Sequence, residues 1–137
     1  NPLFDYEEKL KSQIKRDIAQ IIKLTKIKPQ EVKLFIAEPW KYTFLKKLKS
    51  ELEKSSNFKE ILPKVLDQKH NQEIVKIIQL TLKDRSKLPE IVLSQEEEKK
   101  LIHDLKFQYK TVIILEQQTQ ESKAKQALPG KPAILLK

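Results

Sequence analysis

The sequence ends in the stretch Lys123-Ala-Lys-Gln-Ala-Leu-Pro-Gly-Lys-Pro-Ala-Ile-Leu-Leu-Lys137, which joins a turn signal to an apolar run. Pro129-Gly130 is typical of a turn, because proline presets φ at about −65° and glycine accepts the positive φ that follows. Gly130 is the single glycine of the protein. Free chain ends are usually polar and frayed, whereas Ala133–Leu136 is wholly apolar. We therefore expect the run near residues 132–136 to be packed in place as a strand.

Two further segments are typical of buried strands. In residues 32–37, Val32, Leu34 and Ile36 alternate with Phe35 and Ala37, so apolar side chains occupy both faces. Burial on both faces indicates a central strand. Residues 111–116 begin Thr-Val-Ile-Ile-Leu and are rich in β-branched side chains. They indicate another buried strand.

Apolar residues at helical spacing predict helices around these strands. The first helix is expected over about residues 5–26, and Pro29 follows its end. A second helix is expected to begin near Pro39, because proline suits the first helical turn. Its apolar face places Trp40 in the core with Phe44 and Leu48.

Capping residues indicate where the remaining helices begin. Asn57 begins a segment that Pro63 interrupts, so we expect either two short turns or a kinked helix. Asn71 is the expected cap of the next helix. Ser94, with a glutamate three residues later, indicates a capping box for a helix that runs to about Gln108.

These elements predict an α+β fold, in which a small sheet of about three strands packs with four to five helices. Helices before and after the first strand argue against a purely antiparallel meander, and the strand order is left open. We expect Phe35, Trp40, Ile78 and Ile113 to be mostly buried. A length of 137 residues suits one domain. Because the chain begins without Met, we interpret it as a piece of a longer protein, with residues 1–7 as a linker remnant.

The chain is strongly basic, with a net charge of +9 and a pI of about 9.6. This charge favours a polyanionic partner; the alternative is that abundant lysine serves only as a solubilising surface. Arginine occurs only as Arg16 and Arg85, and lysine suits sequence-neutral phosphate contact better than base reading. The absence of cysteine excludes disulfides and thiolate sites. No signal peptide or membrane-length apolar run is present, so we expect a cytoplasmic protein.

No sequence pattern indicates catalysis. A Gly-rich phosphate loop needs several glycines, and this chain has one. His70 and His103 are separated and show no ligand spacing, so we interpret both as surface residues. Glu96, Glu97 and Glu98 could suggest a metal site, but carboxylates at a helix start are the expected match to the helix dipole. We expect no enzyme activity, metal or cofactor in this chain alone.

Two motifs resemble a known family. Residues 127–134, Ala-Leu-Pro-Gly-Lys-Pro-Ala-Ile, are similar to the closing motif of archaeal and eukaryotic-cytosolic-type leucyl-tRNA synthetases. Residues 32–41, Val-Lys-Leu-Phe-Ile-Ala-Glu-Pro-Trp-Lys, are similar to the strand and Trp-Lys pair that open the same C-terminal region. The order and spacing of the motifs extend the resemblance over nearly the whole chain. The Gln-rich run at 117–126 departs from the family pattern and leaves the register before the tail open.

The resemblance implies a C-terminal tRNA-binding domain that supports aminoacylation by an upstream catalytic domain. The family contacts the long variable arm of leucine tRNA, with the extreme C-terminal segment close to the tip of that arm. The implied partners are leucine isoacceptor tRNAs and the upstream synthetase domains in cis, and ATP is a cofactor of the parent enzyme only. We also expect a monomer that does not contact membranes.

Candidate tRNA contacts fall into two sets. The resemblance points to tail residues that act largely through backbone groups and shape, because aliphatic side chains cannot hydrogen-bond to bases: Lys131, Ala133, Ile134, Leu135, Leu136 and Lys137. The charge points to phosphate-binding lysines on the helix after Pro39: Lys41, Lys46 and Lys49. Two alternatives remain open, a sequence-neutral nucleic-acid-binding module and a scaffolding domain whose tail pairs with a partner protein by β-addition.

Overall fold

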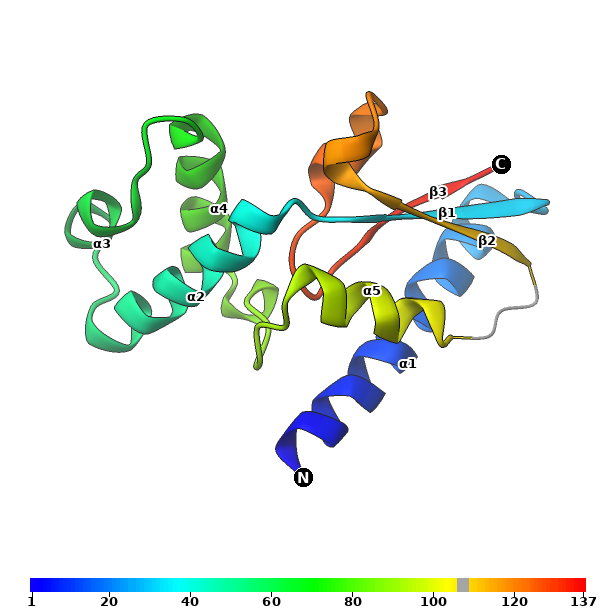
Figure 1. Cartoon of the computed structure of the whole chain (residues 1–137), viewed down its shortest axis with the longest axis horizontal. Coiled ribbons are helices and arrows are strands. Elements are labelled where there is room, and N and C mark those ends of the chain that lie inside the picture. Colours follow the sequence, from blue (N-terminus) through cyan, green and yellow to red (C-terminus); the bar gives the residue numbers. More distant parts are fainter. Residues whose placement is uncertain (106–108) are drawn as a thin grey trace. The chain divides into compact units, whose positions relative to one another are not determined.

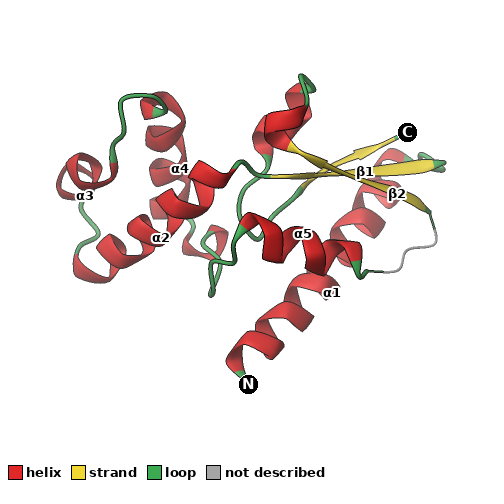
Figure 2. Ribbon diagram, in the orientation of Figure 1, coloured by secondary structure: helices red, strands yellow, loops and turns green. Residues whose placement is uncertain are grey.

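The computed structural model describes residues 1–105 and 109–137, and its helices and strands are shown in Figures 1 and 2. In chain order the elements are α1 (Pro2–Thr25), β1 (Glu31–Ile36), α2 (Pro39–Lys54), α3 (Phe58–Val65), α4 (Asn71–Lys83), η1 (Arg85–Lys87), α5 (Gln95–His103), β2 (Lys110–Leu115), η2 (Glu116–Gln118), η3 (Ser122–Gln126) and β3 (Ala133–Leu136). The predicted α+β class is therefore confirmed. The expected helix end near Gln108 lies outside the described residues.

The expected single domain contains two compact units. The first comprises residues Asn1–Tyr42 and Ile91–Lys137, and the second comprises Thr43–Glu90. The first unit holds the sheet with α1 and α5, whereas the second is helical. Within the described residues, no helix is both long and apolar enough to cross a membrane.

The sheet has β1 at its centre, as the two apolar faces of residues 32–37 predict. The strand order is β2-β1-β3, with β1 parallel to β2 and antiparallel to β3. This mixed sheet agrees with the argument against a purely antiparallel meander. The prediction that residues 111–115 are buried like β1 is wrong, because β2 lies at an edge and its side chains are at most partly buried.

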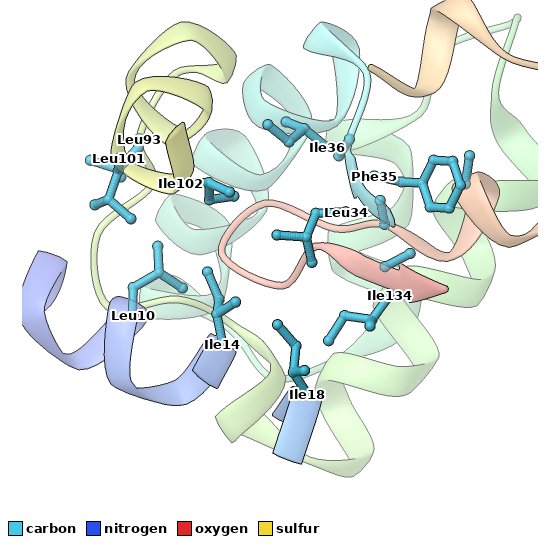
Figure 3. Close-up of a cluster of buried hydrophobic side chains, with 14 of the residues drawn as sticks. Leu10, Ile14, Ile18, Leu34, Phe35, Ile36, Leu93, Leu101, Ile102 and Ile134 are labelled. Atoms are coloured by element: carbon cyan, nitrogen blue, oxygen red, sulfur yellow. The ribbon is translucent and has the colours of Figure 1, made fainter. Parts of the chain in front are cut away.

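One face of the sheet packs against α1 and α5. Figure 3 shows Leu34 directed toward the α1 side chains Ile14 and Ile18, while Phe35 points to the other side of β1. Leu34 and Phe35 are fully buried, and Ile14 is only 1% exposed. Burying such a side chain contributes about 1.5–3 kcal/mol, so this layer is a major source of stability for the first unit.

Residues 1–7 are not an extended linker in the structure. Helix α1 begins at Pro2, and the Asn1 side chain caps it by accepting a hydrogen bond from the Leu3 N–H at 3.0 Å. Proline suits the first helical turn because its missing N–H needs no partner there. Tyr6 is buried, so the amphipathic pattern extends further toward the N-terminus than expected.

The second unit is organised around the apolar faces of α2, α3 and α4. Ile78 is fully buried, as expected. Asn57 caps α3 as predicted, by accepting from the Lys59 N–H at 2.9 Å. Helix α3 continues through Pro63 as one short helix. Helix α4 begins at Asn71 itself, with His70 in the N-cap position, so the expected cap is one residue late.

Two residues expected in the core lie at its margin. Trp40 and Ile113 are partly buried, in contrast to Phe35, which has no exposed surface. The Trp40 ring centroid lies 5.9 Å from the ammonium of Lys41. A tryptophan in such a position keeps one side wet while a cation contacts its face.

Candidate functional site

The C-terminal turn forms as the Pro-Gly pair predicts. Leu128 and Lys131 exchange backbone hydrogen bonds of 3.1 and 2.8 Å across it. Gly130 has φ of 76°, a conformation that glycine reaches without the steric penalty of a side chain. The turn directs the chain into β3, so the apolar end is ordered as a strand.

Strand β3 forms an edge of the sheet and leaves part of its backbone available. Glu31 and Lys137 exchange backbone hydrogen bonds of 3.1 and 2.9 Å. In an antiparallel pair such exchanging positions alternate with positions whose backbone groups point outward. Leu135 and Ala133 therefore share the inward orientation of Lys137, whereas Ile134 and Leu136 direct N–H and C=O groups toward the free edge. No strand among the described residues pairs with that edge.

A buried carboxylate holds the turn in place. Glu98 Oε2 accepts from the Gly130 N–H at 3.0 Å and from the Tyr42 hydroxyl at 2.8 Å. Glu98 is only 1% exposed, and within the described residues its Oε1 has no hydrogen-bond partner. Burial raises the pKa of Glu98 to about 7, although both hydrogen bonds act in the opposite direction. Burial, and then the Glu98 charge, raise the pKa of Tyr42, which remains a hydrogen-bond donor.

A buried ion pair holds the segment that leads into the turn. Lys41 Nζ donates to Glu116 Oε1 at 2.9 Å and to the carbonyl oxygens of Lys125 at 3.1 Å and Ala127 at 2.9 Å. The second oxygen of Glu116 accepts from the Glu38 N–H at 2.9 Å. An ammonium has three donors, and all three are used inside the protein.

The prediction that Lys41 contacts a phosphate is therefore wrong. Its side chain is 2% exposed and its charge is paired with Glu116. A phosphate could reach Lys41 only by breaking this pair, which would leave a buried carboxylate uncompensated. Lys41 instead positions the backbone before the tail.

The other candidate residues differ in their accessibility. In the first unit, Lys131 and Lys137 are exposed, Leu135 and Leu136 are partly buried, and Ala133 and Ile134 are buried at 7% and 8% exposure. In the second unit, Lys46 is exposed, and Lys49 is partly buried and donates to the backbone carbonyl of Glu90. The tail and the two remaining lysines thus belong to different units.

Sequence reasoning missed Tyr42, Glu98 and Glu116. Glu98 was interpreted only as part of an acidic helix start, and the capping box at Ser94 is indeed present. However, Glu98 lies three and four residues before the buried Leu101 and Ile102, and this spacing places it on the same helical face. A charged residue on an apolar face was the available signal for a buried anchor.

The two histidines occupy peripheral positions. His70 Nδ1 lies 3.1 Å from Asp67 Oδ2, and this contact is the main cause of a lowered pKa of Asp67. His103 is exposed at the end of α5. Neither histidine contacts the Glu98 or Glu116 anchors through a described hydrogen bond.

Comparison with known proteins connects this geometry to a family. No family model matches the chain. Over 141 residues it is 29% identical to the leucine–tRNA ligase of Pyrococcus horikoshii, covering 99% of this chain. Over 138 residues it is 30% identical to that of Methanocaldococcus jannaschii, and over 134 residues 31% identical to that of Methanococcus maripaludis, each match covering 95% of this chain.

These relatives are much longer than the chain, which spans 14% of the length of each. Leucine–tRNA ligase is another name for leucyl-tRNA synthetase, so the relatives confirm the resemblance carried by the two motifs. The match covers the strand β1, the anchoring residues and the tail together, because it extends over almost the whole chain. The chain is a homologue of one segment of archaeal leucyl-tRNA synthetases.

Proposed function

We propose that the chain is the C-terminal tRNA-binding appendage of a leucyl-tRNA synthetase and contacts the long variable arm of leucine tRNA. The upstream domains of the parent would perform ATP-dependent aminoacylation in the cytoplasm, and the appendage would support it by holding the tRNA. The chain itself supplies binding groups and no catalytic group. The homology to leucine–tRNA ligases supports the parent assignment.

The observation that carries the tRNA contact is the ordered edge strand at the tail. Ile134 and Leu136 present backbone N–H and C=O groups outward, and these groups can hydrogen-bond to unstacked bases or to the sugar-phosphate backbone. Lys131 and Lys137 flank the strand with exposed cations. The Glu98 and Lys41 anchors fix the strand before RNA arrives, which lowers the entropic cost of binding.

The test is a binding competition with the purified 137-residue chain. A leucine tRNA transcript is compared with the same transcript carrying a shortened variable arm, over a range of salt concentrations. We expect tighter binding of the long-arm tRNA and a steep loss of affinity with salt. Equal affinity for both tRNAs would favour a sequence-neutral module, and salt-independent or absent binding would favour β-addition of a partner protein at the free edge.

A further inference from the structure

The sheet face opposite α1 and α5 carries lysines from all three strands. In the register, Lys110 of β2 lies beside Glu31 of β1, and Glu31 is paired on its other side with Lys137. Lys33 is one row further along β1, between Val112 of β2 and Leu135 of β3. Side chains two residues apart on a strand share a face, so the three lysines lie on the face to which Phe35 also points (Figure 3).

This end of the face is open. Lys110 and Lys137 are exposed, and Lys33, Val112 and Leu135 are partly exposed. The other end is covered, since η3 contacts both β1 and β3 and Phe35 is fully buried. The uncovered area is therefore a patch of basic and aliphatic side chains without an accessible aromatic ring, which is poorly suited to base stacking.

The positive charge of the patch is only partly neutralised. In the part of the chain that the structure describes, Lys33, Lys110 and Lys137 take part in no ion pair within 4.0 Å. The side-chain contact with Lys137 is the largest cause of a lowered pKa of Lys33, followed by burial and by the Lys137 charge. Glu31 and Glu121 act in the opposite direction without cancelling this effect.

Two neighbouring ammonium groups are stabilised by an anion that contacts both. Adjacent strands lie about 4.8 Å apart, so flexible lysine side chains from three strands can converge on one phosphate or on two consecutive phosphates. Lysine on such a face binds phosphate as a point charge and reads no base. The two acidic side chains nearby disfavour a freely diffusing small anion less than they favour a fixed polyanion that spans all three lysines.

We propose that Lys33, Lys110 and Lys137 form a phosphate-binding cluster for an RNA backbone on the open face of the sheet. The cluster is separate from the edge groups of Ile134 and Leu136, which point within the plane of the sheet. Its ligand is taken to be tRNA, and in that respect the inference rests on the proposed function. The cluster contributes affinity, whereas discrimination between tRNAs is left to the edge of β3.

The first test observes the lysines directly in the unmodified chain. Lysine side-chain carbons are labelled with 13C and followed by NMR while the leucine tRNA transcript is added at low salt. The Lys33→Gln variant serves only to assign the Lys33 signal. We expect the Lys33 and Lys137 signals to shift at saturation and the pKa of Lys33 to rise, because a bound phosphate favours the charged ammonium. Unmoved signals at saturation would overturn the proposal.

The second test measures the salt dependence of binding. The variant K33Q/K110Q/K137Q is compared with the matched variant K59Q/K76Q/K83Q, which removes the same charge from exposed positions of α3 and α4. The cluster variant should lower the log–log salt slope by about 2, at roughly 0.7–0.9 for each lost phosphate contact, and should weaken long-arm and short-arm tRNAs equally. The control should lower the slope by less, and melting curves establish that both variants are folded.

The outcomes separate this proposal from the proposed function. Long-arm preference together with equal slopes for the two variants would leave the proposed function standing and remove the cluster. A cluster-dependent slope without any preference between tRNAs would retain the cluster and remove the variable-arm contact. Absence of binding to either tRNA at low salt would overturn both.

Discussion

Glu98 is the residue whose titration should be visible in the stability of the protein. Its pKa is raised from 4.5 to about 7 by burial, so the folded state binds a proton more tightly than the unfolded state. Its contribution is therefore fully present below about pH 4.5 and is lost as the pH rises through about 7. The free energy of unfolding should fall across this window by an amount on the order of 2 kcal/mol.

Glu98→Gln should remove this part of the pH dependence. Glutamine keeps a carbonyl oxygen for the Gly130 N–H and the Tyr42 hydroxyl but does not titrate. Urea unfolding at pH 5 and pH 7.5 measures the difference, with Glu96→Gln as the control because Glu96 is exposed two residues away. Identical pH profiles for E98Q and the parent chain would show that Glu98 does not bind this proton.

Lys41 should be far more important for stability than the neighbouring exposed lysine. Lys41→Met removes the partner of the buried Glu116 and leaves the carbonyl oxygens of Lys125 and Ala127 without their donor. Breaking a buried pair in this way costs about 3–5 kcal/mol. Lys46→Met on the same helix should change stability by no more than about 0.5 kcal/mol. A K41M variant with the melting behaviour of K46M would contradict the anchoring role.

The residue scale also shows where sequence reasoning stops. Lysine at position 41 was assigned to a basic surface because its neighbours are basic, although Leu45, Leu48 and Leu52 follow it at spacings of one helical face. Its burial depends on Glu116, which is 75 residues away in sequence. Local periodicity cannot identify such a distant partner, so an isolated charge on an apolar face is the most that the sequence displays.

At the scale of elements, strand identity was predictable but strand environment was not. The two apolar faces of β1 and the Pro-Gly turn before β3 are local signals, and both gave the observed strands. The order β2-β1-β3 depends on contacts between segments far apart in sequence, and no local pattern contains it. The partial exposure of β2 follows from the same order, since an edge strand has only one neighbour.

The free edge of β3 permits a test with proline at adjacent positions. Proline removes a backbone N–H and is tolerated only where that N–H faces away from the sheet. Leu136→Pro should therefore remain folded, whereas Leu135→Pro removes a bond to Lys33 and should destabilise the protein by an amount on the order of 2 kcal/mol. Thermal melting of the two variants measures this difference. Equal destabilisation would mean that the assigned backbone directions are wrong.

The same L136P variant tests whether the outward N–H contacts tRNA. The matched control is Leu136→Ala, which also loses the leucine side chain but keeps the N–H. If the N–H donates to the variable arm, L136P should lose about tenfold of the preference for long-arm over short-arm tRNA relative to L136A. The two variants would show the same ratio if the edge is structural only.

At the scale of the whole molecule, charge and specificity are carried by different features. The 28 basic residues exceed the 19 acidic residues, and basic side chains occur in both compact units. The net charge was readable from composition, and it favoured a polyanion without selecting one. The choice of leucine tRNA came from two short motifs and from the homology they anticipated. The division into two units was not visible in the sequence, because helix α2 runs continuously from one into the other.

This separation predicts how lysines of the second unit affect binding. Lys46 is exposed on α2 and has no described ion pair, so Lys46→Gln should remove at most one phosphate contact. The log–log salt slope should then fall by roughly 0.7–0.9, and the affinities for long-arm and short-arm tRNAs should fall by the same factor. Filter binding of both transcripts at several salt concentrations measures the slope and the ratio together.

Combining K46Q with L136P gives the most demanding form of this prediction. Lys46 acts through charge and the Leu136 N–H through a directed hydrogen bond, and the two residues belong to different units. Their effects should therefore add, with K46Q changing the slope, L136P changing the ratio, and the double variant showing both changes in full. A ratio that depends on Lys46, or a slope that depends on the Leu136 N–H, would mean that affinity and discrimination arise from one coupled surface. In that case charge alone could not account for the binding of other tRNAs.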